Sequence, residues 1–210
     1  MNARLRAALA ACPIVAILRG VRPDEVEAIG AALVDAGVAI IEVPLNSPQP
    51  FDSISGLVAR FGAQATIGAG TVMTTDDVQR LAAVGAHLVV MPHGDARVIA
   101  AAREAGLAVV PGVATPTEAF AALEAGADAL KLFPAEALPP KVVRAWRAVM
   151  PRDALLLAVG GVTAANMDDY ARAGANGFGI GSSLYAPGRP VAEVAAAARN
   201  LVACARSAGR

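Results

Sequence analysis

The sequence has few charged residues, and it lacks the charge clusters that mark nucleic-acid or membrane surfaces. Charged residues make up 17% of the 210 positions, and 18 Lys and Arg balance 18 Asp and Glu. No run of like charges occurs, which excludes an extended basic or acidic interaction surface. So little charge on a chain of this size also favours an oligomer, because less of its surface then has to face water.

Cysteine and histidine are equally scarce. Cys12 and Cys204 lie at opposite ends of the chain without metal-ligand spacing, so we expect reduced thiols in a cytoplasmic protein. The two histidines, His87 and His93, are too few for a catalytic zinc site, which generally needs several nitrogen or oxygen ligands. No P-loop, G-x-S-x-G or dinucleotide motif occurs either. We therefore expect no metal and no other cofactor.

Long apolar runs are also missing. No run reaches the length of a membrane span, so we expect no membrane partner. The N-terminal stretch MNARLRAALAACPIVAIL is basic and then apolar, as in a signal peptide. However, Pro13 interrupts its apolar part, and Ile14–Leu18 fits a buried strand better.

Short apolar runs alternate with alanine-rich helical patterns along the whole chain. Each run is about four to six residues long and continuous, which is typical of parallel strands buried on both faces. Eight such runs predict an α/β fold, a (β/α)8 TIM barrel, as a single domain over residues 1–210. We expect an extra N-terminal helix over residues 2–11 and a last helix over 190–207. The predicted strands are Ile14–Leu18, Ile40–Leu45, Thr66–Gly70, Leu88–Met91, Ala108–Pro111, Ala129–Phe133, Leu155–Val159 and Gly177–Ile180.

The helix boundaries carry local signals. Glycine ends a helix readily because it adopts the left-handed conformation, and hydroxyl side chains favour the first position of a helix. The predicted helix ends are Gly37, Gly85, Gly106, Gly126 and Gly174. Hydroxyls precede helical patterns at Thr74, Thr115 and Thr163.

A buried lysine is the strongest indication of chemistry. In a TIM barrel, reactive residues lie at the C-terminal ends of strands or in the loops that follow. Of the two lysines, Lys141 opens a helix at the surface, whereas Lys131 lies inside the predicted sixth strand, within Ala-Leu-Lys-Leu-Phe-Pro. Desolvation inside a barrel lowers the pKa of a lysine and makes its amine nucleophilic. The alternative is a lysine that a carboxylate holds for stability alone.

Three polar residues follow or interrupt the first three predicted strands. Glu42, within Ile-Ile-Glu-Val-Pro-Leu-Asn, can act as a general acid and base, or else form an ion pair with Lys131 or Arg19. Arg19 ends the first strand and can hold a substrate carboxylate through two hydrogen bonds, unless it pairs with Glu42. Thr71 follows the third strand and is a candidate hydrogen-bond donor at the barrel mouth.

Glycines end the last two predicted strands. The sequence is Val-Gly-Gly-Val-Thr at Gly160 and Gly161, and Gly-Ile-Gly-Ser-Ser at Gly181 and Ser182. Loops at these two places form the usual phosphate site of TIM barrels, where backbone amides approach the anion. Close packing alone is the alternative. We interpret His93, after the fourth strand, as a polar loop residue rather than a catalytic one.

Taken together, these stretches resemble the family of 2-keto-3-deoxy-6-phosphogluconate and 6-phosphogalactonate aldolases, which are class I aldolases with a (β/α)8 barrel. The resemblance implies that Lys131 forms a Schiff base with the ketone of a phosphorylated keto sugar acid and releases pyruvate, while Glu42 transfers protons. The matching stretches run in family order over residues 13 to about 185: Pro-Ile-Val-Ala-Ile-Leu-Arg-Gly, Ile-Glu-Val-Pro-Leu-Asn-Ser-Pro, Ile-Gly-Ala-Gly-Thr-Val, Leu-Lys-Leu-Phe-Pro-Ala and Ala-Val-Gly-Gly-Val-Thr.

The resemblance also implies roles in binding and assembly. Arg19 and Thr71 would hold the pyruvate half of the substrate. The substrate phosphate would bind at Gly160, Gly161, Gly181 and Ser182. Members of the family are typically homotrimers, which agrees with the low charge content.

Two positions depart from the phosphogluconate branch of this family. Asn46 stands where that branch has an arginine that helps to bind the carboxylate, so Arg19 would carry more of that task. Val159 stands where that branch has threonine, and loss of a hydroxyl near C4 suits the C4 epimer. The resemblance therefore favours the phosphogalactonate branch, with the phosphogluconate branch as the alternative.

Two alternatives of other classes stay open. A phosphosugar isomerase or epimerase on the same barrel would share the phosphate glycines but would not need a Schiff-base lysine. A phosphosugar-binding regulator without catalysis would need none of Lys131, Glu42 and Arg19, although all three are present.

Overall fold

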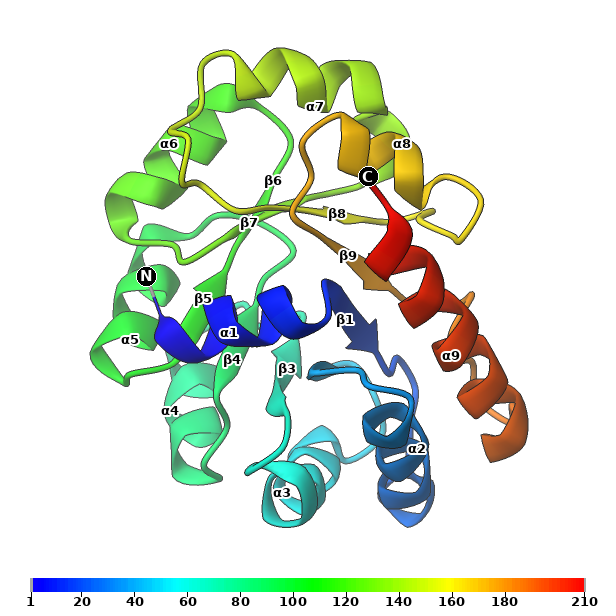
Figure 1. Ribbon diagram of the computed structural model, residues 1–210. Helices are drawn as coiled ribbons and strands as arrows, with labels where there is room; N and C mark the ends of the chain where they lie inside the picture. The colour runs from blue at the N-terminus through cyan, green and yellow to red at the C-terminus, as the bar shows by residue number, and fades with distance from the viewer. Residues whose placement is uncertain (1, 210) are drawn as a thin grey trace.

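A computed structural model describes residues 2–209, which form a ring of helices around a barrel of parallel strands (Figure 1). The α-helices are α1 (Ala3–Ala11), α2 (Pro23–Asp35), α3 (Pro50–Phe61), α4 (Thr75–Ala83), α5 (Ala96–Glu104), α6 (Pro116–Ala125), α7 (Pro140–Arg147), α8 (Met167–Arg172) and α9 (Val191–Ser207). The strands are β1 (Ile14–Ile17), β2 (Ile40–Pro44), β3 (Thr66–Gly70), β4 (Leu88–Val90), β5 (Ala108–Val110), β6 (Gly112–Val113), β7 (Leu130–Leu132), β8 (Leu156–Val159) and β9 (Gly177–Ile180). A short 3₁₀ helix, η1 (Ala135–Ala137), follows β7.

The barrel closes through a fifth strand that is split in two. The sheet order is β5-β4-β3-β2-β1-β9-β8-β7-β6, and β5 pairs with β4 whereas β6 pairs with β7. Between β5 and β6 lies Pro111, which has no N–H to donate to a ladder. The amide of Asp128 donates to the carbonyl of Val109 at 2.9 Å, which joins β5 to the segment before β7. The predicted (β/α)8 barrel is confirmed, and its fifth strand extends past the predicted end to Val113.

Two apolar layers explain why the strands are continuous apolar runs. One layer packs between the strands and the helices, and the other fills the barrel interior with residues such as Val15, Val90 and Leu157. Leu5 and Leu9 of α1 belong to the interior layer. Figure 1 shows α1 lying across the end of the barrel, so this extra helix closes it.

Polar contacts hold α1 in this position. The amide of Asn2 donates to Oδ1 of Asp128, whose Oδ2 accepts from the amide of Val109 at 3.0 Å. The guanidinium of Arg4 donates to the carbonyls of Gly62 and Ala65. The predicted N-terminal helix is thereby confirmed and is tied to the loops at the N-terminal ends of β3 and β7.

The predicted helix boundaries hold with one exception. All five predicted glycines have positive φ, from 73° at Gly85 to 105° at Gly174, and Thr74 and Thr115 each accept a bond from a backbone amide of the following helix. The prediction for Thr163 is wrong, because α8 begins later, at Met167. Instead, the amide of Thr163 donates to Oδ1 of Asn166 at 2.8 Å, so a side-chain turn precedes the helix.

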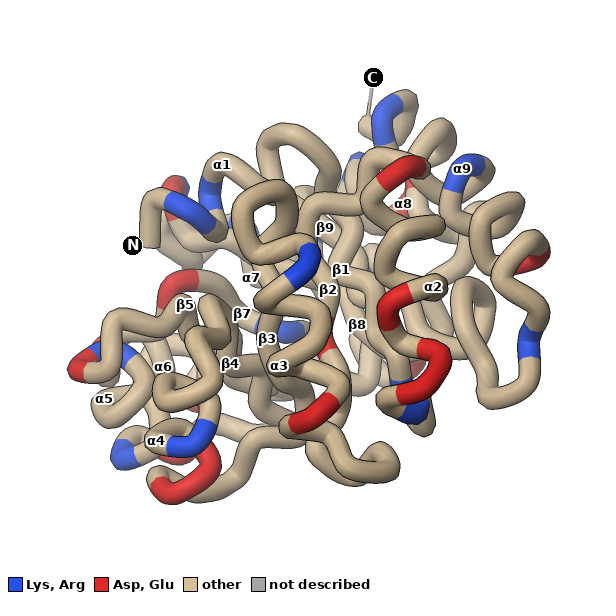
Figure 2. Tube along the Cα trace, turned by 90° about the horizontal axis from the view of Figure 1, so that it is seen from below, with Lys and Arg blue, Asp and Glu red and all other residues tan. Residues whose placement is uncertain are grey.

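Charged residues of both signs are spread over the outer helices and loops (Figure 2). Within residues 2–209, no helix is both long and apolar enough to cross a membrane. Cys12 is buried, Cys204 is half-buried, and neither forms a disulfide bond.

Candidate active site

A cavity of about 630 Å³ opens at the C-terminal ends of β1, β7, β8 and β9. Side chains alternate across a strand, so residues two apart in sequence face the same side. Each of the four strands contributes such a pair to the lining: Ile17 and Arg19, Lys131 and Phe133, Val159 and Gly161, Gly179 and Gly181.

Lys131 reaches this cavity from the middle of β7. Its neighbours in the sheet are Gly112 of β6 and Leu157 of β8, and only 6% of its surface is exposed. Burial lowers the pKa of its amine, the negative charge of Glu42 opposes that effect, and the positive charge of Arg19 adds to it. Lowering the pKa increases the neutral, nucleophilic fraction of the amine.

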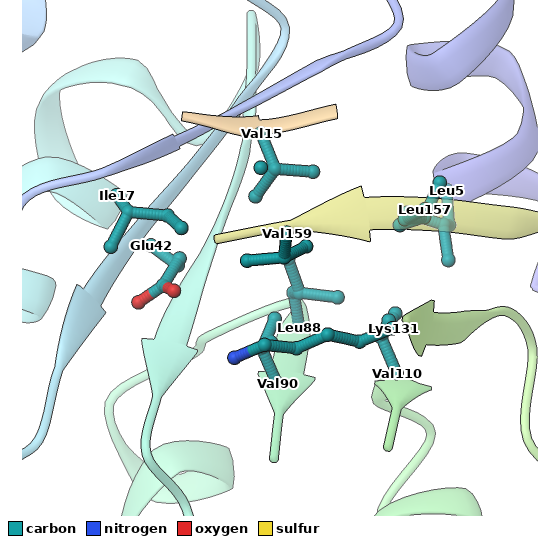
Figure 3. Close-up of a pocket in the computed structure, with 11 residues that line it drawn as sticks. Leu5, Val15, Ile17, Glu42, Leu88, Val90, Val110, Lys131, Leu157 and Val159 are labelled. Atoms are coloured by element: carbon teal, nitrogen blue, oxygen red, sulfur yellow. The ribbon is translucent and has the colours of Figure 1, made fainter. Parts of the chain in front are cut away.

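Glu42 faces Lys131 from β2. In Figure 3 the amine of Lys131 extends across the barrel toward the Glu42 carboxylate. Burial raises the pKa of Glu42 to about 7, while the charges of Lys131 and Arg19 and a backbone hydrogen bond at Gly70 act in the opposite direction. Among residues 2–209, no direct ion pair joins Glu42 to either cation, and its Oε2 has no hydrogen-bond partner. The arrangement thus differs from the structural ion pairs that we considered as alternatives.

Gly70 provides the space for the Glu42 carboxylate. A Cβ atom at Gly70 would lie 2.0 Å from Oε2 of Glu42, so any larger residue would displace that group. Sequence reasoning identified Thr71, which follows Gly70, but not this contact. Thr71 follows with φ of 58°, which is an unusual conformation for a β-branched residue and often marks functional sites. Thr71 does not belong to the lining of the 630 Å³ cavity.

Arg19 and Asn46 come together at the cavity mouth. Nη1 of Arg19 donates to Oδ1 of Asn46 at 2.7 Å. A second bond, from the amide of Gly20 to Oγ of Ser47 at 3.0 Å, joins the same two loops after β1 and β2. Arg19 is exposed and lines the cavity, so its remaining N–H groups are available to an anion.

The predicted phosphate residues Gly160, Gly161, Gly181 and Ser182 all line the cavity. Gly160 and Gly161 have φ of 103° and 67°, and a Cβ atom at either position would meet the side chain of Glu136. A Cβ atom at Gly181 would meet no atom within 4 Å. Sequence reasoning missed Thr163 and Ser183, which also line this end and carry hydroxyls suited to a phosphate.

Of the other residues considered from the sequence, Val159 lies at the cavity, whereas His93 and His87 lie away from it. Val159 lines the cavity and packs against Gly179. A Cβ atom at Gly179 would lie 2.7 Å from Cγ2 of Val159. His93 is exposed after β4 and does not belong to the lining. His87 lies at the opposite end of the barrel, where its Nδ1 accepts from the amide of Ile67 at 3.1 Å.

Phe133 was not identified from the sequence. Its ring centroid lies 4.4 Å from Nζ of Lys131. The signal was present, because Phe133 follows Lys131 by two positions and the strand alternation places both on the same side.

A buried lysine of lowered pKa lines the cavity of this TIM barrel, and it faces a buried carboxyl of raised pKa, Glu42, in the barrel interior; such a pair is typical of an enzyme with amine-based and acid–base chemistry. The family model for KDPG and KHG aldolase matches residues 5–194. The chain belongs to this family, and it is therefore an aldolase, a carbon–carbon lyase.

Individual relatives agree with the family assignment. The chain is 50% identical over 182 residues to a probable 2-dehydro-3-deoxy-6-phosphogalactonate aldolase of Rhizobium meliloti, covering 87% of this chain and 86% of the relative. It is 47% identical to the 2-dehydro-3-deoxy-6-phosphogalactonate aldolase of Escherichia coli, covering 93% and 96%. A solved structure described as native KDPGal matches with a TM-score of 0.92 and 47% identity over 93% of this chain and 95% of that one.

Proposed function

We propose that this aldolase cleaves 2-dehydro-3-deoxy-6-phospho-D-galactonate reversibly to pyruvate and D-glyceraldehyde 3-phosphate through a Schiff base on Lys131. The observation that carries the mechanism is the burial of Lys131 at the cavity, opposite Glu42. The choice of substrate is supported by two relatives of 47% and 50% identity that are named for it. Relatives named for phosphogluconate cleavage are 28% to 30% identical.

The reaction begins at the amine of Lys131. The neutral amine adds to the C2 ketone, and uptake of one proton with loss of water leaves a protonated imine. This imine withdraws electrons from the C3–C4 bond and makes its cleavage possible. Burial supports the first step, because it lowers the pKa of the amine.

Glu42 transfers the protons. Its carboxylate accepts the proton of the C4 hydroxyl while the C3–C4 bond breaks, and glyceraldehyde 3-phosphate leaves. The same group then returns a proton to C3 of the enamine, and hydrolysis of the imine frees pyruvate. A pKa of about 7 lets the carboxyl act in both directions near neutral pH.

The two ends of the substrate bind on opposite sides of Lys131. Arg19, oriented by Asn46, and Thr71 hold the carboxylate of the pyruvate half. The phosphate binds at the turns after β8 and β9, at Gly160, Gly161, Gly181 and Ser182. Val159 and Asn46 favour the galacto epimer, because an apolar side chain at Val159 gives no hydrogen bond to a gluco-configured C4 hydroxyl.

We also propose that the chain forms a homotrimer in the cytoplasm. Charged residues are only 17% of the sequence, and both cysteines are unpaired, which suits a reducing compartment. A 47% identical chain with a TM-score of 0.92 occurs in a cage designed by fusing symmetric oligomeric domains. Light scattering coupled to size exclusion gives the mass of the assembly; a monomer would contradict the trimer.

The substrate is tested by following pyruvate release from the phosphogalactonate compound and from its phosphogluconate epimer, side by side, with EDTA and without added metal. We expect clear preference for the galacto substrate. Preference for the gluco substrate would overturn the branch and keep the mechanism. No release from either compound would contradict the aldolase mechanism and favour a phosphosugar isomerase or a binding protein.

A further inference from the structure

Phe133 lies where it can affect the charge of the reactive amine. It follows the last residue of β7, and the strand alternation places it on the same side of the strand as Lys131. Its ring centroid is 4.4 Å from Nζ of Lys131, within the range of a cation–π contact. The ring also lines the cavity and is 36% exposed, so one side of it faces the space for substrate.

The positive charge on Nζ has few other partners. Glu42 faces it from β2 and Arg19 from the end of β1, and these are the charged groups that act on it. Arg19 repels a cation, and Glu42 forms no direct ion pair with Lys131 among residues 2–209. Leu157 and Val159 lie beside Lys131 in the barrel interior and are apolar. A buried cation in such surroundings is costly unless a group compensates its charge.

We propose that Phe133 is a further catalytic residue, whose ring face stabilises the positive charge on Nζ of Lys131 in the ammonium and again in the protonated imine. The ammonium first gives up one proton, and the neutral amine adds to the carbonyl carbon. When that proton returns and the former carbonyl oxygen leaves as water, the protonated imine carries the same single positive charge that the ammonium carried. The negative face of the aromatic ring attracts either cation. Glu42 loses its negative charge when its carboxyl takes up a proton, whereas the ring of Phe133 still attracts the cation. The imine part rests on the proposed function, whereas the ammonium part does not.

The ammonium part can be measured directly because the chain has only two lysines. Protein labelled with ¹³C-lysine gives two ε-carbon signals, which a Lys141→Arg variant assigns, and each is titrated with pH. We expect Phe133→Leu to move the Lys131 midpoint down by about one pH unit and to leave Lys141 unchanged. Phe120→Leu is the matched control, because Phe120 is an exposed phenylalanine on α6.

A second variant keeps the shape of the ring. Trifluorophenylalanine at position 133 weakens the negative ring face with little change in packing, so it also decides the question if Phe133→Leu fails to fold. We expect it to lower the Lys131 midpoint in the same direction. A midpoint that matches the Phe120→Leu control in both variants would overturn the proposal.

The imine part is tested by reductive trapping with pyruvate and cyanoborohydride at pH 8. Reduction requires the protonated imine, so we expect trapping to slow several-fold in the trifluorophenylalanine variant. Equal trapping rates in this variant and the wild type would overturn the imine part. If the wild type itself were not trapped, the proposed function would fail, while the lysine titration would still decide the effect of Phe133.

Discussion

Arg19 donates a hydrogen bond from Nη1 to Oδ1 of Asn46 across 2.7 Å, and this bond links the loops that follow β1 and β2. From the resemblance we expected Asn46 to stand where the phosphogluconate branch of the family has an arginine. This bond agrees with the expectation that Arg19 binds the substrate carboxylate. We propose that Asn46 orients the guanidinium of Arg19, whereas an arginine in its place would add a second guanidinium.

Replacing Asn46 with alanine tests this orientation. Without its partner, the Arg19 guanidinium samples more conformations and binds the pyruvate carboxylate less well. We expect the KM for pyruvate in the aldol direction to rise about three- to tenfold, the effect of one lost hydrogen bond. Asn200→Ala, at an exposed position of α9, is the matched control. An unchanged KM would show that Asn46 does not position Arg19.

Gly70→Ala tests the space for the Glu42 carboxylate. The added methyl group would lie 2.0 Å from Oε2 of Glu42, so the carboxylate must move away from its place opposite Lys131. We expect kcat to fall about 100-fold, the size of a general acid–base contribution, with a modest change in Tm. Gly56→Ala, where a Cβ atom meets Glu27 only at 3.6 Å, controls for the substitution itself. Near wild-type turnover in Gly70→Ala would contradict the assigned role of Glu42.

The raised pKa of Glu42 predicts a dependence of stability on pH. The folded protein holds this proton up to about pH 7, compared with an ordinary pKa of 4.5. The stability that this proton contributes to the folded state is therefore complete below pH 4.5, and it is lost as the pH rises through about 7. Glutamine does not ionise, so the Glu42→Gln variant has no buried charge to destabilise it at high pH. We expect its Tm to exceed that of the wild type by about 5 °C at pH 8 and to match it near pH 4.

In the Glu42→Gln variant we expect catalytic activity to fall while stability rises. Glutamine cannot accept a proton, so kcat should fall about 100-fold or more although the protein is more stable. Glu104→Gln on the outside of α5 is the surface control and should change neither property. A Tm difference between Glu42→Gln and the wild type that does not vary with pH would contradict the raised pKa.

Gly181→Ala separates the phosphate end from the pyruvate end. A Cβ atom here meets nothing within 4 Å and the φ is not positive, so the fold tolerates alanine. The methyl group would instead hinder the approach of the phosphate to the backbone. We expect the KM for glyceraldehyde 3-phosphate to rise about tenfold and the KM for pyruvate to stay unchanged. Equal changes in both values would argue against a phosphate site at this turn.

Local patterns predicted most of the fold. Continuous apolar runs identified every strand except β6 because the barrel buries both faces of its strands, and the predicted left-handed glycines all have positive φ. β6 was missed because Pro111 interrupts the ladder, and closure of the barrel depends on strand pairs that are distant in sequence. The start of α8 was misplaced because the side chain of Asn166, rather than a hydroxyl, forms the preceding turn.

The site was predicted by residue type and place, but its contacts were not. Lys131 and the four phosphate residues line one cavity, as their strand ends indicate. The Asn46 bond to Arg19 and the ring of Phe133 over Lys131 are contacts between side chains, and the Glu42 carboxylate lies against the backbone of Gly70. Such contacts depend on rotamers and on the separation of strands, which periodicity does not encode.

Borohydride reduction in the presence of pyruvate, followed by peptide mass analysis, tests the Schiff base on Lys131. We expect the adduct to form on Lys131 alone, to persist in Lys141→Arg and to disappear in Lys131→Arg, which keeps the positive charge. An adduct on Lys141, or full turnover by a folded Lys131→Arg variant, would contradict the Schiff base on Lys131.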